Sequence, residues 1–247
     1  MTLHAELMAT IHKATTQHPR SLQVRIGPSE IGITCDRRLG YKVLCAPERL
    51  NDETPWRPTV GTAVHAWLGE TFATYAEPGR YLLEQRVTVG TIAILGDISG
   101  NADLFDTITG TVVDWKVPSA STIKHAATHG PSEQYQTQAH LYGQGLVNAG
   151  HTVNHVAICY LPASGELADG YWWTEPFNPE IAKRALARLE RITIAAHALG
   201  DARPLRTANS YCEYCPYLAP DLCDGDPAYK PRTPNKPTLK PLRTKDS

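Results

Sequence analysis

The sequence lacks an apolar run long enough to cross a bilayer, and residues 1–20 lack the apolar core of a signal peptide. These two absences predict a soluble cytoplasmic protein with no membrane association. A G-x-x-x-x-G-K-[ST] phosphate-binding loop is also missing, which excludes a helicase motor within the 247 residues. Any motor that acts with this chain is therefore expected to be a separate protein.

The chain has almost no net charge, since 24 Lys and Arg residues stand against 25 Asp and Glu residues. A net charge of −1 argues against a protein that coats nucleic acid by bulk charge. The apolar fraction of 42% is typical of a globular domain. Residues 228–247 differ, because they are rich in proline, lysine and arginine and nearly devoid of apolar side chains. They predict an extended basic tail, which serves either as a solubilising terminus or as an arm that contacts phosphates.

Hydrophobic periodicity predicts a mixed α/β protein. Short β-branched or alternating runs separated by glycines indicate an antiparallel meander, and later strands alternate with amphipathic helices. The expected helices cover residues 3–17, 59–75, 131–148 and 178–200, and the expected strands cover 81–89, 91–98, 101–106, 111–116, 155–161 and 170–174. This order predicts a mixed central β-sheet flanked by helices.

Acidic residues and a lysine cluster in the predicted meander. Asp114 and Lys116 are separated by one residue at the end of an apolar strand, so both side chains point to the same face. Asp103 lies on the preceding strand and can approach Asp114 if the two strands pair. Converging carboxylates need a compensating charge, and a divalent cation with oxygen ligands supplies it. Such a cation with a nearby lysine suits phosphodiester hydrolysis.

Each of these residues also has a simpler interpretation. A strand-end Asp-x-Lys is most often a solvated surface pair, and Asp103 suits a turn. Asp97 and Asp106 are rival carboxylates in the same segment. The acidic segment gains specificity only from other motifs in the chain.

The six cysteines predict a metal centre in place of a disulfide framework. Cys212, Cys215 and Cys223 crowd into one segment, and a closed site needs a fourth thiolate, for which Cys35 is the candidate and Cys45 the rival. Cys159 lies in an apolar run and suits a buried hydrophobic position. Chemistry alone leaves zinc and a 4Fe–4S cluster equally suitable, since both accept four thiolates.

The order of these motifs resembles the RecB-like branch of the PD-(D/E)XK nuclease superfamily, and in particular its CRISPR-associated and phage-encoded exonucleases. That order is a cysteine, G-x-x-x-H, G-x-x-D, D/E-x-K, Q-x-x-x-Y and three cysteines. The chain offers Cys35, Gly61 to His65, Gly100 to Asp103, Asp114 to Lys116, Gln138 to Tyr142, and finally Cys212, Cys215 and Cys223. The resemblance covers residues 29–224 and implies a restriction-endonuclease-like core.

The resemblance implies a role for each matched residue. Asp103 and Asp114 correspond to carboxylate ligands of Mg²⁺ or Mn²⁺, the Trp115 carbonyl to a further ligand, and His65 to a nitrogen ligand that favours Mn²⁺. Lys116 corresponds to the catalytic lysine. Gln138 and Tyr142 resemble the pair that positions the DNA strand and supports that lysine.

The resemblance also favours a 4Fe–4S cluster over zinc at Cys35, Cys212, Cys215 and Cys223, although the gap between the last two is longer than the usual one. The cluster is expected to act as a structural staple between distant parts of the chain. Residues 1–205 are then a nuclease core, 206–227 a cysteine-cluster segment and 228–247 the basic tail. The implied function is a metal-dependent DNA exonuclease for recombination, repair or phage DNA processing, acting on single strands or free ends, with a recombination or helicase protein as a partner. An endonuclease of the same superfamily and a non-catalytic DNA-binding or adaptor module are the alternatives.

Basic and aromatic side chains are the expected DNA contacts, because single strands are held by basic grooves with stacking aromatics. The available residues are Arg37, Arg38, Lys42, Lys124, Trp56, Trp67, Tyr135 and Trp172. Of these, Trp67 is expected in the core.

Overall fold

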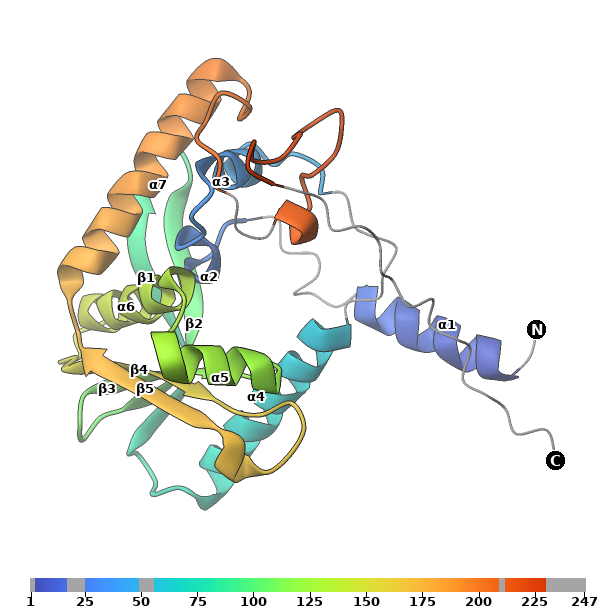
Figure 1. The fold of residues 1–247 in the computed structure, drawn as a ribbon. Helices are drawn as coiled ribbons and strands as arrows, with labels where there is room; N and C mark the ends of the chain where they lie inside the picture. Colours follow the sequence, from blue (N-terminus) through green and yellow to red (C-terminus); the bar gives the residue numbers. More distant parts are fainter. Residues whose placement is uncertain (1–2, 17–24, 49–55, 209–211, 230–247) are drawn as a thin grey trace.

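The computed structural model describes residues 3–16, 25–48, 56–208 and 212–229, and nearly all of the predicted basic tail lies outside these ranges (Figure 1). The helices are α1 (Leu3–Thr16), α2 (Pro28–Ile31), α3 (Asp36–Val43), α4 (Trp56–Tyr75), α5 (Ala120–His129), α6 (Glu133–Asn148) and α7 (Pro179–Leu199), with short 3-10 turns η2 (Leu167–Asp169) and η3 (Cys212–Tyr214). The strands are β1 (Tyr81–Ile92), β2 (Gly96–Asp106), β3 (Thr111–Lys116), β4 (His155–Tyr160) and β5 (Tyr171–Pro176).

The five strands form one mixed sheet in the order β1-β2-β3-β4-β5. Neighbouring strands are antiparallel except β3 and β4, which are parallel and are joined through α5 and α6. A parallel pair needs a long crossover connection, and these two helices provide it. The structure therefore confirms the predicted mixed sheet flanked by helices.

Helices cover both faces of the sheet. The larger core joins α2, α3, α6 and α7 to one face, with Leu141, Leu146 and Leu189 fully buried in it. The smaller core places α4 against the other face, where Leu68 packs with Trp115. The site described below lies where α4 and α6 both reach the sheet.

The predicted strand at 91–98 is wrong, because the chain turns at residues 93–95 and forms two long strands where three were expected. Gly90 and Gly100, two of the glycines that separate the predicted strands, lie inside the observed strands. A Cβ atom at Gly90 would come within 2.6 Å of Leu186, and one at Gly100 within 2.9 Å of Pro28. These two glycines therefore permit close packing, whereas Gly96 directly follows the β1–β2 turn and Gly110 lies in the β2–β3 turn, with φ of +77° and +66°.

The predicted helices at 59–75, 131–148 and 178–200 are confirmed with small shifts of their ends. Asn178 caps α7, since its side chain accepts a hydrogen bond from the amide of Glu180, and Pro179 occupies the first turn. Helix α5 was not predicted. In the part of the chain that the structure describes, no helix has the length and apolar character needed to span a membrane.

The segment around η3 packs against α3 and the chain that follows α7. Tyr41, Ala202, Tyr217 and Cys223 form a small core of their own there. The Arg37 amide donates a hydrogen bond to the Arg206 carbonyl at 3.0 Å, which ties α3 to the chain leading into this segment. In Figure 1 the segment lies beside α3, far from the open edge of β5.

Gly145 provides a test of the close contact between α6 and β1. A Cβ atom there would lie 2.6 Å from Val87 Cγ2, while one at Gly69 on α4 would meet nothing within 4 Å. We expect Gly145→Ala to lower the free energy of unfolding by about 1–3 kcal/mol, because the added methyl overpacks the core. The control Gly69→Ala is expected to raise it by up to ~1 kcal/mol through helix propensity. Urea denaturation of both variants measures the difference, and equal effects would contradict the described packing.

Candidate metal and catalytic site

Strands β2 and β3 separate at Asp103 and Asp114. Their pairing ends at Leu104 and Val113, and the next position along each strand is the aspartate. Asp103 Oδ2 accepts a hydrogen bond from the Trp115 amide at 2.8 Å, so a side-chain oxygen takes the place of a backbone partner at the fork. Asp103 is 7% exposed and Asp114 is 2% exposed. The fork thus places two buried carboxylates side by side.

Lys116 and Gln138 enclose the Asp114 carboxylate. Lys116 Nζ forms an ion pair with Asp114 Oδ2. Gln138, on α6, donates from Nε2 to Asp114 Oδ1 at 2.8 Å and accepts from Lys116 Nζ at 3.1 Å. The amide therefore bridges the acid and the lysine and fixes the orientation of both.

Burial raises the pKa of Asp114 to about 6; Lys116 opposes this rise and Asp103 adds to it. Desolvation is the largest cause because it disfavours the charged carboxylate. Lys116 therefore compensates only part of the negative charge at the fork. The remaining charge and the oxygen donors make this a suitable place for a divalent cation.

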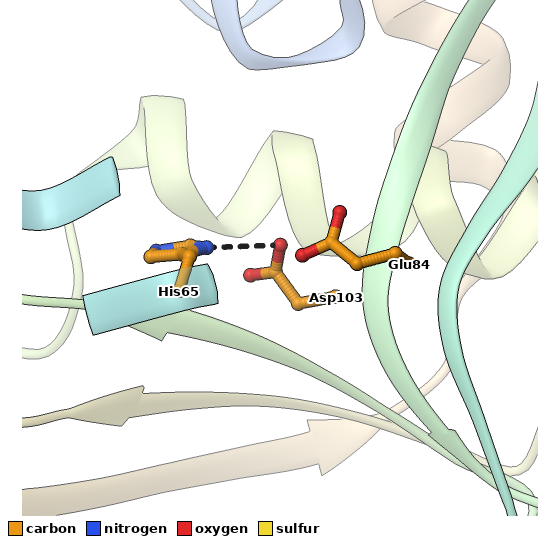
Figure 2. Close-up of side chains that lie close together, drawn as sticks. All are labelled: His65, Glu84 and Asp103. Atoms are coloured by element: carbon orange, nitrogen blue, oxygen red, sulfur yellow. Dashed lines mark ion pairs between the residues drawn. The ribbon is translucent and has the colours of Figure 1, made fainter. Parts of the chain in front are cut away.

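His65 approaches Asp103 from α4 on the other side of the fork. Its Nδ1 atom lies 3.2 Å from Asp103 Oδ1, and the imidazole is 16% exposed (Figure 2). Glu84 of β1 joins the pair, and one ligand atom from each of the three residues lies within 4.8 Å of the others. The donor set of one nitrogen and two carboxylates suits a divalent metal ion.

Glu84 was not among the predicted site residues. The pairs Leu83–Leu104 and Gln85–Ala102 flank it, so the register places Glu84 opposite Asp103. The position of Glu84 could have been predicted from the correct boundaries of β1 and β2. Because a strand break was expected at Gly90, the long β1–β2 hairpin was not recognised and Glu84 was missed.

The side chains of two predicted site residues, Tyr142 and Trp115, lie in packed surroundings. The Tyr142 ring packs against the bare Cα of Gly100, with Tyr142 Cε1 3.1 Å from where a Cβ would stand, and is 7% exposed. The Trp115 side chain lies in the smaller core, 5.7 Å from the Phe72 ring, so only its backbone faces the fork. Tyr135, expected only as a DNA contact, instead places its ring centroid 4.7 Å from Lys116 Nζ.

The rival carboxylates belong to other interactions. Asp106 pairs with Arg80 at 3.1 and 3.2 Å, and this contact lowers the pKa of the Asp106 carboxyl. Asp97 accepts a hydrogen bond from Thr91 Oγ1 at 2.7 Å near the β1–β2 turn. Neither residue reaches the fork.

A second group of residues with metal-binding chemistry is formed by four cysteines. Cys35, Cys212, Cys215 and Cys223 line one cavity together with Arg38 and Tyr41. Cys45, the rival for the first position, is exposed and does not line it. Cys159 lies in β4, where burial raises the pKa of its thiol to about 11, as suits a buried packing residue.

Several residues that were expected to contact DNA form contacts within the protein. Lys42 is 9% exposed and pairs with Glu48 at 2.9 Å, and Arg37 donates to Cys223 Sγ at 3.6 Å. The expectation that Trp67 lies in the core is wrong: it is 61% exposed. It faces outward from α4 with Trp56, and both line a shallow apolar pocket.

The raised pKa of Asp114 predicts a pH-dependent stability in metal-free protein. A carboxyl group whose folded pKa exceeds its unfolded value stabilises the fold at low pH, and this contribution is lost as pH rises through about 6. Between pH 8 and pH 5 we expect the wild type to gain about 1 kcal/mol relative to Asp114→Asn. Urea denaturation with a chelator present measures this, and parallel pH profiles for the two proteins would contradict it.

Comparison with known proteins shows the fold. No protein-family model and no curated protein matches the chain. Among solved structures, the crystal structure of SSO0001 superimposes with a TM-score of 0.51 at 15% identity, over 90% of this chain and 98% of that one. An alkaline exonuclease from Laribacter hongkongensis superimposes with a TM-score of 0.50 at 11% identity, over 77% of this chain and 93% of that one. The five-stranded mixed sheet and its flanking helices are thus consistent with a restriction-endonuclease-like fold.

Proposed function

We propose that this chain is a divalent-metal-dependent DNA nuclease of the PD-(D/E)XK type that hydrolyses phosphodiester bonds. The observation that carries the proposal is the fork between β2 and β3, where Asp103, Asp114 and Lys116 meet with Gln138. Two buried carboxylates and a lysine held by an amide are the groups that phosphodiester hydrolysis requires. The fold supports the proposal, because an exonuclease shares it.

The donor set fits a divalent cation at the fork. Asp103 and Asp114 would hold it, with the Trp115 carbonyl as a further oxygen donor, and His65 supplies a nitrogen that favours Mn²⁺ over Mg²⁺. A cation bound there supplies Lewis-acid chemistry, since it acidifies water and neutralises phosphate charge.

In the proposed reaction Lys116 positions the reacting groups and stabilises the negative charge that develops. Its ammonium lies beside Asp114 and is held by Gln138 Oε1. From this position it can donate a hydrogen bond to the attacking water or to an oxygen of the phosphate as negative charge develops there. The Tyr135 ring 4.7 Å from Nζ adds a favourable cation–π contact and limits the rotamers of the lysine.

Exonuclease action on single strands or DNA ends is the preferred form of this activity. The chain has no helicase motor motif, so a separate helicase or recombinase is the partner that would deliver such ends. Recombination, repair and phage DNA processing in the cytoplasm are the settings in which this combination would act.

Mutation of the fork tests the nuclease proposal. With Mn²⁺ supplied, the wild type is expected to release nucleotides from linear DNA, and Asp114→Asn and Lys116→Gln to lose at least about 100-fold of the rate. The first removes a negative ligand of the proposed cation, and the second removes a positive group that stabilises charge in the transition state. Lys183→Gln removes a charge from an exposed lysine of α7 that pairs with Glu180, and it should leave the rate unchanged.

The form of the substrate separates the alternatives. Cleavage of linear but not circular single-stranded DNA supports an exonuclease, whereas cleavage of both indicates an endonuclease of the same superfamily. DNA binding without any metal-dependent cleavage would overturn the proposal and leave a DNA-binding or adaptor module.

We further infer that the four-cysteine cavity holds a 4Fe–4S cluster. A zinc ion with Zn–S bonds of about 2.3 Å would hold its tetrahedral sulfur atoms about 3.8 Å apart. Within the described ranges, the one set of three or more potential metal-ligand atoms that all lie within 4.8 Å of one another comes from His65, Glu84 and Asp103. No three of the four cysteine sulfur atoms are therefore that close together. The sulfur atoms are thus spread more widely than zinc requires, which supports a larger four-thiolate group.

Cysteine substitution tests the cluster. Anaerobically purified wild type should be brown, with a broad absorption band near roughly 400 nm and iron and sulfide in equal amounts. Cys223→Ser should lose the band and unfold at a lower temperature, because the staple between distant segments is gone. The matched control Cys45→Ser should keep the band, since Cys45 is exposed and outside the cavity. A colourless protein with stoichiometric zinc would contradict the inference.

A further inference from the structure

Three carboxylates lie on three neighbouring strands. The β1–β2 register places Glu84 opposite Asp103, and the β2–β3 register places Asp114 at the next position on the other side of Asp103. Asp103 is therefore the middle member, with an acidic residue on each side. Asp114 forms an ion pair with Lys116, and Asp103 Oδ1 lies 3.2 Å from His65 Nδ1.

Two local features of Glu84 are unfavourable for an ordinary strand residue. Like charges directly opposite each other on paired strands destabilise a sheet. Its backbone φ is +46°, in the left-handed region that side chains other than glycine rarely adopt. Strain of this kind persists where the surroundings or a function maintain it. Both unfavourable features coincide at the residue that faces Asp103 and His65.

The geometry around Glu84 suits a cation. The ligand atoms of His65, Glu84 and Asp103 lie within 4.8 Å of one another. Ligands of an octahedral ion at about 2.1 Å are about 3 Å apart when adjacent and about 4.2 Å apart when opposite. Figure 2 shows the imidazole and the Glu84 carboxylate pointing toward Asp103 from opposite sides. Glu84 is exposed, which leaves room for the waters that such an ion retains.

Asp114 has partners of its own in the protein. Its Oδ1 atom accepts from Gln138 at 2.8 Å, and its Oδ2 atom faces Lys116. The fork therefore has two separate positions for positive charge, one between Asp103 and Asp114 and one between Asp103 and Glu84. Because neighbouring strands are about 4.8 Å apart, the two positions are separated by roughly that distance, near the spacing of two-metal sites.

We propose that His65, Glu84 and Asp103 form a second divalent-cation site, with Asp103 shared between it and the cation position at Asp114. The inference rests on the proposed nuclease function for that first position. It makes Glu84 a metal ligand, a role that none of the sequence motifs assigns to this residue. It also moves the imidazole nitrogen of His65, which the sequence resemblance places on the first ion, to the second ion, which makes this position the more selective for Mn²⁺.

Counting bound Mn²⁺ in the full-length protein without DNA tests the proposal. Equilibrium dialysis with electron paramagnetic resonance of free Mn²⁺ should give two ions for the wild type. Glu84→Gln should lose the second ion or bind it at least about tenfold more weakly, since a charged ligand becomes a neutral one. The control Asp97→Asn removes the same charge from an exposed carboxylate near the other end of the β1–β2 hairpin and should still bind two. One ion in the wild type, or unchanged binding by Glu84→Gln, would overturn the proposal.

Glu84→Gly separates a ligand role from a structural one. Glycine adopts a φ of +46° without strain, so metal-free Glu84→Gly should melt at the same temperature as the wild type or higher. The same variant should show a smaller rise in melting temperature on adding Mn²⁺, because ligand binding stabilises the fold by mass action. An equal Mn²⁺-induced rise in both proteins would refute the ligand role.

Failure of this inference is distinguishable from failure of the nuclease proposal. A chain that binds two Mn²⁺ ions in a Glu84-dependent manner but never cleaves DNA refutes the nuclease proposal alone. A chain that cleaves DNA while Glu84→Gln binds Mn²⁺ as the wild type does refutes the second site alone.

Discussion

The hydrogen bond from the Trp115 amide to Asp103 Oδ2 governs the architecture of the site. Two antiparallel strands that separate leave backbone amides without ladder partners, and burial makes such a loss costly. Asp103 meets this need at 2.8 Å and so stays buried at the fork in a fixed orientation. Its other oxygen is then directed to His65. One carboxylate thereby terminates the β2–β3 ladder, orients the imidazole and supplies negative charge beside Asp114.

The parts of this arrangement that follow from local chemistry could be predicted. Alternation along a strand places Asp114 beside Lys116, and a helix after that strand can deliver Gln138 to both, as the structure shows. Glu84 could not be found in this way. Its position depends on strand register over a hairpin whose glycines at 90 and 100 resemble turns in sequence and serve close packing in three dimensions. A glycine that admits a neighbouring helix and a glycine that bends the chain look alike until the neighbour is known.

Tertiary packing also determines which aromatic side chains are buried and which lie beside Lys116. The Tyr142 ring fills the space left by Gly100, whereas Tyr135, two turns earlier on α6, lies next to Lys116. Trp67 was expected in the core, yet its side chain is 61% exposed and lines a pocket with Trp56. Periodicity identifies which residues share a face, whereas the extent of burial depends on the surface that the face meets.

The cysteine cavity and the fork are connected through the short helix α2. Arg188 on α7 pairs with Asp36, which follows Cys35, and also donates to the carbonyls of Ile31 and Ile33. Gly32 lies so close to α6 that a Cβ atom there would be 2.7 Å from the Gln134 backbone, one turn before Gln138. The segment from Ile31 to Asp36 is thus fixed by Arg188 on one side and by the α6 backbone at Gln134 on the other. Because Cys35 lies within this segment and Gln138 follows Gln134 on α6, a change at Cys35 can reach the helix that orients Lys116 through packed structure.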